Sequence, residues 1–301
     1  MIETTASKSF ADRSGDTPFA SAGKDGLEAT RVSPLLWLHL VCLDAPFVAI
    51  IWAFLFARHF DLPSAFGAGS ALFLTAWLIY LADRFGDSVA LADLGSTSLR
   101  QRFCIRRRPL WLAWIGIIAT ADLLVIGTQV EARTLLAGGE VGLFALAYLT
   151  VNQWRPSCWR IVPLKEISIG FLFAAGTMVP LVAGLTSEML PAWLLFAFLC
   201  SLNCVSIAVW ERGLDVAQGR ISVATAFPQV GPYLQVALVL LTVASGVLFF
   251  AANTGRGVLV GISVSAALLA GVHFFRDKVQ ADLRTALADL VLLTPVFALL
   301  L

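Results

Sequence analysis

The sequence predicts an all-α, polytopic membrane protein, and three observations support this prediction. Of its 301 residues, 58% are hydrophobic and only 14% are charged, whereas a soluble domain would carry roughly a quarter charged residues. Apolar windows of about 20 residues, the length that crosses a bilayer as a helix, recur along nearly the whole chain. Lysine and arginine are also shared unequally between the connections that separate these windows.

The first 33 residues differ from the rest of the chain. They are polar, rich in Ser, Gly and Thr, of mixed charge, and contain no sustained apolar stretch. A signal peptide would need a basic start and an apolar core, so this composition instead predicts a disordered polar tail over 1–33. We expect residues 34–301 to form a single transmembrane domain, because no linker or second domain is visible there.

From residue 34 onward, apolar stretches and the prolines between them predict about nine transmembrane helices. Pro46 and Pro180 fall inside spans and predict kinks. Glycines scattered through the spans, such as Gly170 and Gly271, predict close helix packing. Most other prolines lie near span starts or in the loops before them, where a missing N–H is tolerated: Pro63, Pro109, Pro156, Pro163, Pro191 and Pro232. The predicted spans are 35–57, 65–87, 109–129, 133–152, 164–186, 190–212, 231–252, 257–275 and 282–301.

Basic residues predict the orientation of these spans. If the tail is cytoplasmic and the spans alternate, eighteen lysines and arginines fall on the cytoplasmic side, and only Arg58, Arg133 and Arg256 fall on the other. Cytoplasmic loops carry such an excess of positive charge. We therefore expect an integral membrane protein, of the bacterial inner-membrane type, with a cytoplasmic N-terminus and a C-terminus on the opposite side.

Two short runs carry most of the functional information: Asp83-Arg84-Phe85-Gly86-Asp87 and Glu211-Arg212-Gly213-Leu214-Asp215. Each reads acid-Arg-x-x-acid at the end of a long apolar segment. Carboxylates four residues apart share one helix face, and such pairs at a membrane surface are costly unless a cation such as Mg²⁺ lies between them. The alternative is that the carboxylates are solvated and paired with Arg84 and Arg212. The predicted catalytic metal ligands are Asp83, Asp87, Glu211 and Asp215.

Polar and basic groups extend this candidate site. Tyr80 and Asn203 precede the two acid pairs by about one and two helical turns, so each face continues into the membrane with a polar group. Lys165 opens the fifth span, and cations together with metal-bound carboxylates are what a diphosphate needs. We therefore predict that Lys165 is catalytic. The predicted substrate-binding residues are Tyr80, Asn203, Arg84, Arg212 and Asp44.

Other polar residues have plainer interpretations. The basic run 100–108 favours a role in topology and in attraction to anionic lipid, rather than in catalysis. Asp44 either serves the site or bonds to a neighbouring helix, whereas Asp122 and Asp289 are expected to be structural. Two histidines are expected to be hydrogen-bonded core groups, with no His-Cys-Asp cluster that would suggest a metal site: His39 and His273.

These stretches resemble the motifs of the UbiA superfamily of intramembrane prenyltransferases, whose members have nine transmembrane helices. Residues 77–87 are similar to the family's Asn-x-x-x-Asp-x-x-x-Asp motif on the second helix. Residues 203–215 are similar to its Asp-x-x-x-Asp-x-x-x-Asp motif on the sixth helix. Pro163-Leu164-Lys165-Glu166 is similar to the Pro-x-x-Lys-Arg start of the fifth. In span count and motif placement the resemblance covers about residues 35–301.

The chain also departs from the family pattern. Ile79 and Ile207 stand where the family has the leading Asn and the leading Asp. Glu211 replaces the middle Asp of the second motif, and Glu166 replaces the basic residue of the fifth-helix motif. Two carboxylates per half remain, which is enough for one or two Mg²⁺ ions. The resemblance is therefore to a divergent member with degenerate motifs.

The resemblance implies a Mg²⁺-dependent prenyltransferase, which moves an isoprenoid chain from a prenyl diphosphate donor to a hydrophobic aromatic or lipid acceptor. Membrane lipids are the other expected partners, and a net charge of +1 gives no sign of nucleic-acid binding. A UbiA-type terpene cyclase remains an alternative, as does a non-catalytic protein that binds or transports isoprenoids or lipids. A transporter would be expected to show repeat symmetry over whole spans and broken helices.

Overall fold

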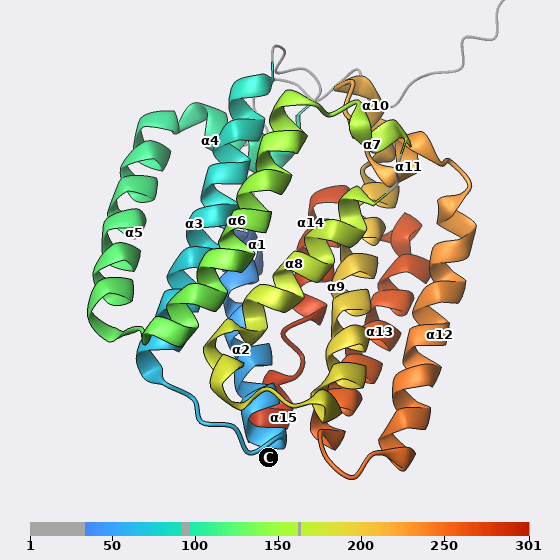
Figure 1. Cartoon of the computed structure of the whole chain (residues 1–301). Helices are drawn as coiled ribbons and strands as arrows, with labels where there is room; N and C mark the ends of the chain where they lie inside the picture. The colour runs from blue at the N-terminus through green and yellow to red at the C-terminus, as the bar shows by residue number, and fades with distance from the viewer. Residues whose placement is uncertain (1–33, 92–96, 162–163, 301) are drawn as a thin grey trace, which may run out of the picture. The chain divides into compact units, whose positions relative to one another are not determined.

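The computed structural model of this chain consists of helices joined by short loops (Figure 1). It describes residues 34–91, 97–161 and 164–300, so the predicted tail over 1–33 and Pro163 lie outside the described residues. Within those ranges there is no strand. The prediction of an all-α protein is therefore confirmed.

The helices follow one another closely along the chain. The first half contains α1 (Pro34–Leu40), α2 (Asp44–His59), α3 (Phe66–Ala90), α4 (Leu99–Arg106), α5 (Arg108–Gln129), α6 (Ala132–Trp154) and α7 (Cys158–Ile161). The second half contains α8 (Lys165–Met178), the 3₁₀ turns η1 (Val179–Gly184) and η2 (Ser187–Met189), α9 (Leu190–Trp210), α10 (Arg212–Ala217), α11 (Val223–Ala226), α12 (Val230–Ala251), α13 (Arg256–Phe274), η3 (Arg276–Lys278), α14 (Ala281–Val291) and α15 (Val296–Leu300).

Seven helical segments among the described residues are long and apolar enough to cross a membrane. They are Phe66–Val89, Arg108–Gln129, Ala132–Trp154, Lys165–Gly184, Ser187–Trp210, Val230–Ala251 and Arg256–Phe274. They coincide with the second to the eighth predicted spans. The first and ninth predicted spans are also helical, but each is broken into two pieces, α1 with α2 and α14 with α15.

Prolines explain both breaks. A proline lacks an N–H, and in a helix its ring clashes with the carbonyl four residues earlier. For Pro46 that carbonyl belongs to Cys42, which adopts a left-handed backbone with a φ of 58°, and α2 begins just after it at Asp44. For Pro295 the carbonyl belongs to Val291, where α14 ends. The kink predicted at Pro46 is therefore a complete break.

Two tryptophans satisfy carbonyl groups that the breaks release. The indole Nε1 of Trp77 donates to the carbonyl oxygen of Val41 at 2.9 Å. The indole Nε1 of Trp52 donates to the carbonyl oxygen of Leu292, also at 2.9 Å. Inside a bilayer no water replaces such partners, so these bonds allow the irregular backbone to stay within the bundle.

Trp52→Phe is expected to destabilise the folded protein by about 1–3 kcal/mol. The new ring can keep the stacking on Phe196, whose centroid lies 4.4 Å away, but the carbonyl of Leu292 loses its donor. The fall in the midpoint of thermal unfolding in detergent measures this effect. Trp37→Phe is the control because that ring is 43% exposed. An unchanged midpoint for Trp52→Phe would show that the bond contributes nothing.

The most extensive apolar core lies among α2, α8, α9 and α13. Trp52, Phe56, Phe196 and Ile262 are completely buried there. Helix α6, at the periphery, buries none of its residues and exposes large apolar side chains such as Phe144. An apolar exterior of this kind suits contact with lipid rather than water.

The close packing predicted at the glycines is found at one of the two positions named above. A Cβ atom on Gly170 would lie 2.3 Å from the backbone nitrogen of Ser201, so α8 and α9 are in contact through their backbones. The prediction is wrong for Gly271, where a Cβ atom would meet nothing within 4 Å.

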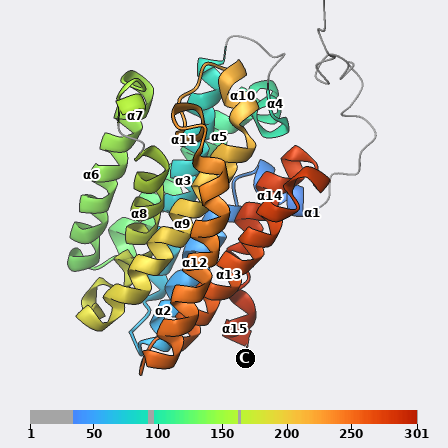
Figure 2. The same ribbon diagram turned by 90° about the vertical axis from the view of Figure 1, so that its right-hand side faces the viewer.

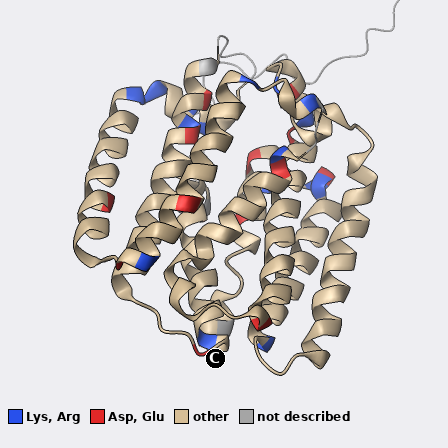
Figure 3. Ribbon diagram, viewed as in Figure 1, with Lys and Arg blue, Asp and Glu red and all other residues tan. Residues whose placement is uncertain are grey.

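One end of the bundle carries the short helices that connect the long ones. Helices α4, α7, α10 and α11 lie at this end, whereas α15 lies toward the opposite end (Figure 1). Most of the lysine and arginine positions coloured on the ribbon lie at the same end as the short helices (Figure 3). In the view turned by 90°, α1 lies against α14 (Figure 2). These placements bring the residues of the candidate site together.

Candidate functional site

The two acid pairs lie where long helices end. Asp83 and Asp87 occupy the last two turns of α3. Glu211 stands at the junction of α9 and α10, and the N–H of Asp215 donates to its carbonyl at 2.9 Å, which preserves the helical spacing. Carboxylates near the negative C-terminal end of a helix are electrostatically unfavourable, so they need cations from other elements.

Two arginines outside the acid motifs supply those cations. Arg100 on α4 binds both carboxylate oxygens of Glu211, with Nη2 at 3.1 Å from Oε1 and 2.8 Å from Oε2. Arg220, in the loop after α10, forms an ion pair with Asp87. Arg84 is a weaker partner of Asp87, at 3.9 Å. Arg100 thus contacts an acid motif directly, whereas from the sequence most of the basic run was assigned to topology and lipid attraction. Arg220 carries no motif that distinguishes it in the sequence.

The charged groups of both motifs share neighbours. The charges nearest to Asp83 include Asp87, Arg84, Lys165 and Arg220, and Lys165 and Arg220 also act on Asp215. Lys165 is the first residue of α8, as predicted. The fold thus gathers four carboxylates and four cations at one end of the bundle: Asp83, Asp87, Glu211, Asp215, Arg84, Arg100, Lys165 and Arg220.

Two of these carboxylates are unusual. Burial raises the pKa of Asp215 to about 6, and the neighbouring Glu211 adds to the shift while Arg220 and Lys165 oppose it. Asp83 makes no hydrogen bond or ion pair with the residues that the structure describes. Asp83 is therefore the carboxylate in this set that a ligand can approach without displacing a bonded partner.

Local hydrogen bonds hold α4, and with it Arg100, in place. Ser98 and Gln101 form a capping box at the start of α4. The side-chain amides of Gln101 and Gln218 also bond to one another, at 2.9 and 3.3 Å. The N–H of Leu99 donates to Asp282 at 3.2 Å. These contacts connect α4 to the loop after α10 and to α14.

Two residues near the motifs lie elsewhere. Arg212 is exposed on α10 and pairs with no acid among the described residues, so the structure does not bring it together with the other predicted substrate-binding residues. Glu166 is buried, and its Oε1 accepts a hydrogen bond from the N–H of Val223 at 3.0 Å. Glu166 thus connects α8 to the start of α11, which is a structural role in place of the basic residue expected there.

The two polar residues predicted deeper in the bundle line one cavity. Tyr80 and Asn203 both face it, together with Asp289. Its volume of about 20 Å³ admits a water molecule or an ion but no larger group. Tyr80 and Asn203 therefore lie side by side around one cavity, and their role in substrate binding stays a prediction.

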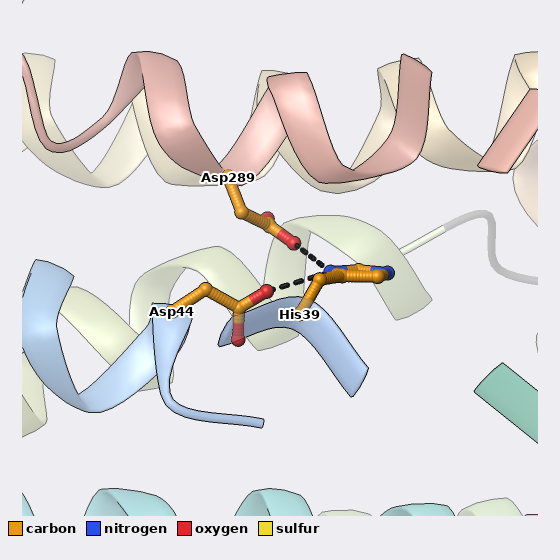
Figure 4. Close-up of side chains that lie close together, drawn as sticks. All are labelled: His39, Asp44 and Asp289. Carbon is orange, nitrogen blue, oxygen red and sulfur yellow. Dashed lines mark hydrogen bonds and ion pairs between the residues drawn. The ribbon is translucent and has the colours of Figure 1, made fainter. Parts of the chain in front are cut away.

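A cluster of His39, Asp44 and Asp289 lies beside this cavity (Figure 4). The Nδ1 atom of His39 is 2.7 Å from Oδ2 of Asp44 and 3.4 Å from Oδ2 of Asp289. From the sequence we predict no cluster of this kind, and in that respect the prediction is wrong. Asp289 bonds to Asn203 of the neighbouring helix α9, as its structural interpretation predicts. His39 and His273 are both hydrogen-bonded core groups, as predicted, and Nδ1 of His273 accepts from Trp210 at 3.0 Å.

Arg100 connects the cluster to the acid motifs. Its Nη1 atom lies 3.4 Å from Nε2 of His39, while Nη2 binds Glu211. On the other side of the cluster, Nδ2 of Asn203 donates to Oδ1 of Asp289 at 2.9 Å. A continuous polar path therefore runs from the charged end of the bundle to the inner cavity.

Comparisons with known proteins support the fold. No family model matches this chain, and no curated protein matches its sequence. Among solved structures, the chain is similar to the apo structure of a UbiA homolog from Aeropyrum pernix K1, with a TM-score of 0.53 and 14% identity, over 91% of this chain and 100% of that one. At this identity the likeness concerns the fold. The protein is an integral membrane protein with a UbiA-like fold.

Proposed function

We propose that this protein is a Mg²⁺-dependent prenyltransferase, which takes an isoprenoid chain from a prenyl diphosphate and attaches it to a hydrophobic aromatic or lipid acceptor. The observation that carries the proposal is the gathering of four carboxylates and four cations, from both halves of the chain, at one end of an apolar bundle. Carboxylates alone would suit a cation, and arginines alone would suit an anion. Both together suit a magnesium diphosphate.

The residues present fit this metal. Mg²⁺ prefers hard oxygen ligands, and Asp83, Asp87, Glu211 and Asp215 supply carboxylate oxygens. Asp83 is free of hydrogen bonds and ion pairs with the described residues, whereas Asp87 and Glu211 must exchange an arginine for the metal. When bound, Mg²⁺ would neutralise charge on the diphosphate oxygens.

The released cations have a role in the same reaction. Arg100 and Arg220, once released, would donate to the diphosphate together with Lys165. These bonds would stabilise the diphosphate as the bond to the allylic carbon breaks and the electron pair leaves with oxygen. The acceptor forms the new bond to that carbon and loses a proton. Positive charge on the allylic group would be stabilised by aromatic faces near the cavity, such as Phe173.

The inner cavity bears on how a donor would bind. A volume of about 20 Å³ is far too small for an isoprenoid chain. We therefore propose that the helices around it, among them α2 and α14 next to the two breaks, separate when the donor enters. We also propose that the charged end faces the cytoplasm, because the loops at that end hold the excess of lysine and arginine.

Release of pyrophosphate tests the proposal. Purified full-length protein is supplied with short- and long-chain prenyl diphosphates, with Mg²⁺ or with EDTA, and with membrane extract as a source of acceptor. We expect release with Mg²⁺ and none with EDTA. No release from any donor under these conditions would refute the catalytic proposal. Release without any acceptor would identify a terpene cyclase instead.

One observation favours a second candidate, a transport protein. Broken helices are typical of transporters, and the first and last predicted spans are both broken. Buried Asp44 lies at the first break, and Asp289 lies close to the second. Uptake of a labelled isoprenoid lipid into proteoliposomes, without release of pyrophosphate, would support transport over transfer.

A further inference from the structure

The cluster of His39, Asp44 and Asp289 is an unusual group to find inside an apolar bundle. His39 and Asp44 are 7% and 5% exposed, and the side chain of Asp289 is 22% exposed. The three residues come from α1, from the first position of α2, and from α14, so the chain breaks bring them together (Figure 4). None of the three is among the proposed Mg²⁺ ligands, although Asp44 is one of the predicted substrate-binding residues.

The two carboxylates of this cluster face a single imidazole, so a protonated His39 would balance only one of them. Arg100 is the nearest guanidinium, but it already binds both carboxylate oxygens of Glu211. With a neutral imidazole, Asp44 and Asp289 together carry two negative charges in a buried position. Uncompensated buried charges are strongly unfavourable, so either protons or a cation must neutralise them, and a dication would balance the charge completely.

Asn203 supplies an independent sign that something binds here. It is 5% exposed, and its Oδ1 atom has no hydrogen-bond partner among the residues that the structure describes. Its Nδ2 atom holds Asp289, and both residues line the same small cavity. A buried amide oxygen without a donor costs free energy unless a ligand completes it.

We propose that His39, Asp44 and Asp289, with Oδ1 of Asn203 as a further oxygen, form a binding site for one divalent transition-metal ion. The ligand atoms of the first three residues all lie within 4.8 Å of one another. One imidazole and several oxygens suit ions such as Zn²⁺, Mn²⁺, Fe²⁺ or Co²⁺. The site is separate from the proposed Mg²⁺ site and does not depend on prenyl transfer.

The distances require only a small adjustment for an ion to enter. Ligands about 2.1 Å from a tetrahedral ion lie roughly 3.4 Å from one another. Nδ1 of His39 and Oδ2 of Asp289 are already 3.4 Å apart, whereas Asp44 is hydrogen-bonded to Nδ1 at 2.7 Å and must move outward. The ion replaces the proton that this hydrogen bond now shares. The proton of His39 then resides on Nε2, and Arg100 turns fully to Glu211.

Cobalt binding tests the site directly. Full-length protein in detergent, with millimolar Mg²⁺ present to saturate the acid motifs, is titrated with Co²⁺ and followed by its visible absorption. We expect tight binding of one Co²⁺ per chain. His39→Gln and Asp289→Asn should each weaken Co²⁺ affinity by at least about 100-fold. Mutating a residue that only supports a metal ligand costs about 10- to 100-fold in affinity, and removing the ligand itself should cost more. His273→Gln and Asp122→Asn replace buried residues outside the cluster and should leave binding unchanged.

Two results would overturn the proposal. The first is Co²⁺ binding that is equally tight in the unmodified protein and in His39→Gln. The second result applies even if the variants do not fold. We expect Zn²⁺, added in excess Mg²⁺, to raise the midpoint of thermal unfolding of the unmodified protein. An unchanged midpoint would mean that only protons neutralise the cluster. If the protein binds Co²⁺ at this site but releases no pyrophosphate, the metal site is supported and the proposed prenyltransferase function is refuted.

Discussion

Asp83→Asn is expected to lower Mg²⁺-dependent release of pyrophosphate by roughly 100- to 1,000-fold, the range for losing one fixed group that stabilises transition-state charge. Asparagine has the same shape but no negative charge for the metal. Asp83 has no hydrogen bond or ion pair with the described residues to lose, so the fold should survive. The loss should appear in kcat/KM at saturating Mg²⁺.

A matched substitution shows whether the loss of activity comes from losing a charge at the site or from losing any aspartate charge in the bundle. Asp122 on α5 is a buried aspartate that accepts a hydrogen bond from Thr75 at 2.8 Å. Asp122→Asn should retain the activity within about twofold, because that residue lies outside the charged cluster. Equal activity in Asp83→Asn and in the unmodified protein would exclude Asp83 as a metal ligand.

Gly170→Ala is expected to destabilise the protein by about 3 kcal/mol, the upper part of the usual range for overpacking. The added Cβ would lie 2.3 Å from the nitrogen and 2.5 Å from the Cα of Ser201. Both are backbone atoms, so no side-chain rotation relieves the clash and α8 must move away from α9. Since Lys165 and Asn203 belong to these two helices, we also expect weaker binding of the donor.

Gly271→Ala is the control for this effect. A Cβ atom there meets nothing within 4 Å, and alanine favours a helix more than glycine does. Its thermal midpoint in detergent should therefore stay the same or rise. If both alanine variants unfold at the midpoint of the unmodified protein, the backbones of α8 and α9 are not in the close contact described above.

The sequence was sufficient for the helices and for the acid motifs. Hydropathy and proline positions located seven spans, because crossing a bilayer requires about 20 apolar residues whatever their tertiary contacts. The spacing of Asp83 and Asp87 placed both on one helical face, a local property of the α-helix. Pro295 could have indicated the second break by the same rule that predicted a kink at Pro46.

The partners of those acids could not be predicted in the same way. Arg100 and Glu211 are 111 residues apart in the sequence, and nothing in the basic run distinguishes Arg100 from its neighbours. Arg220 lies in a short polar loop without a motif. Which cation neutralises which carboxylate depends on how α4 and the loop after α10 pack. From the sequence alone, several neighbouring arginines were equally plausible partners for these carboxylates.

The sequence by itself therefore determined the spans, the two acid motifs and the start of α8 at Lys165, because each follows from local periodicity and from the cost of polar groups in lipid. Only the tertiary structure decided that His39, Asp44 and Asp289 meet, since they lie on three helical segments separated by breaks. The sequence shows that an ionisable residue lies in an apolar segment. The packing of α1, α2 and α14, which are distant in the sequence, determines which side chain becomes its partner.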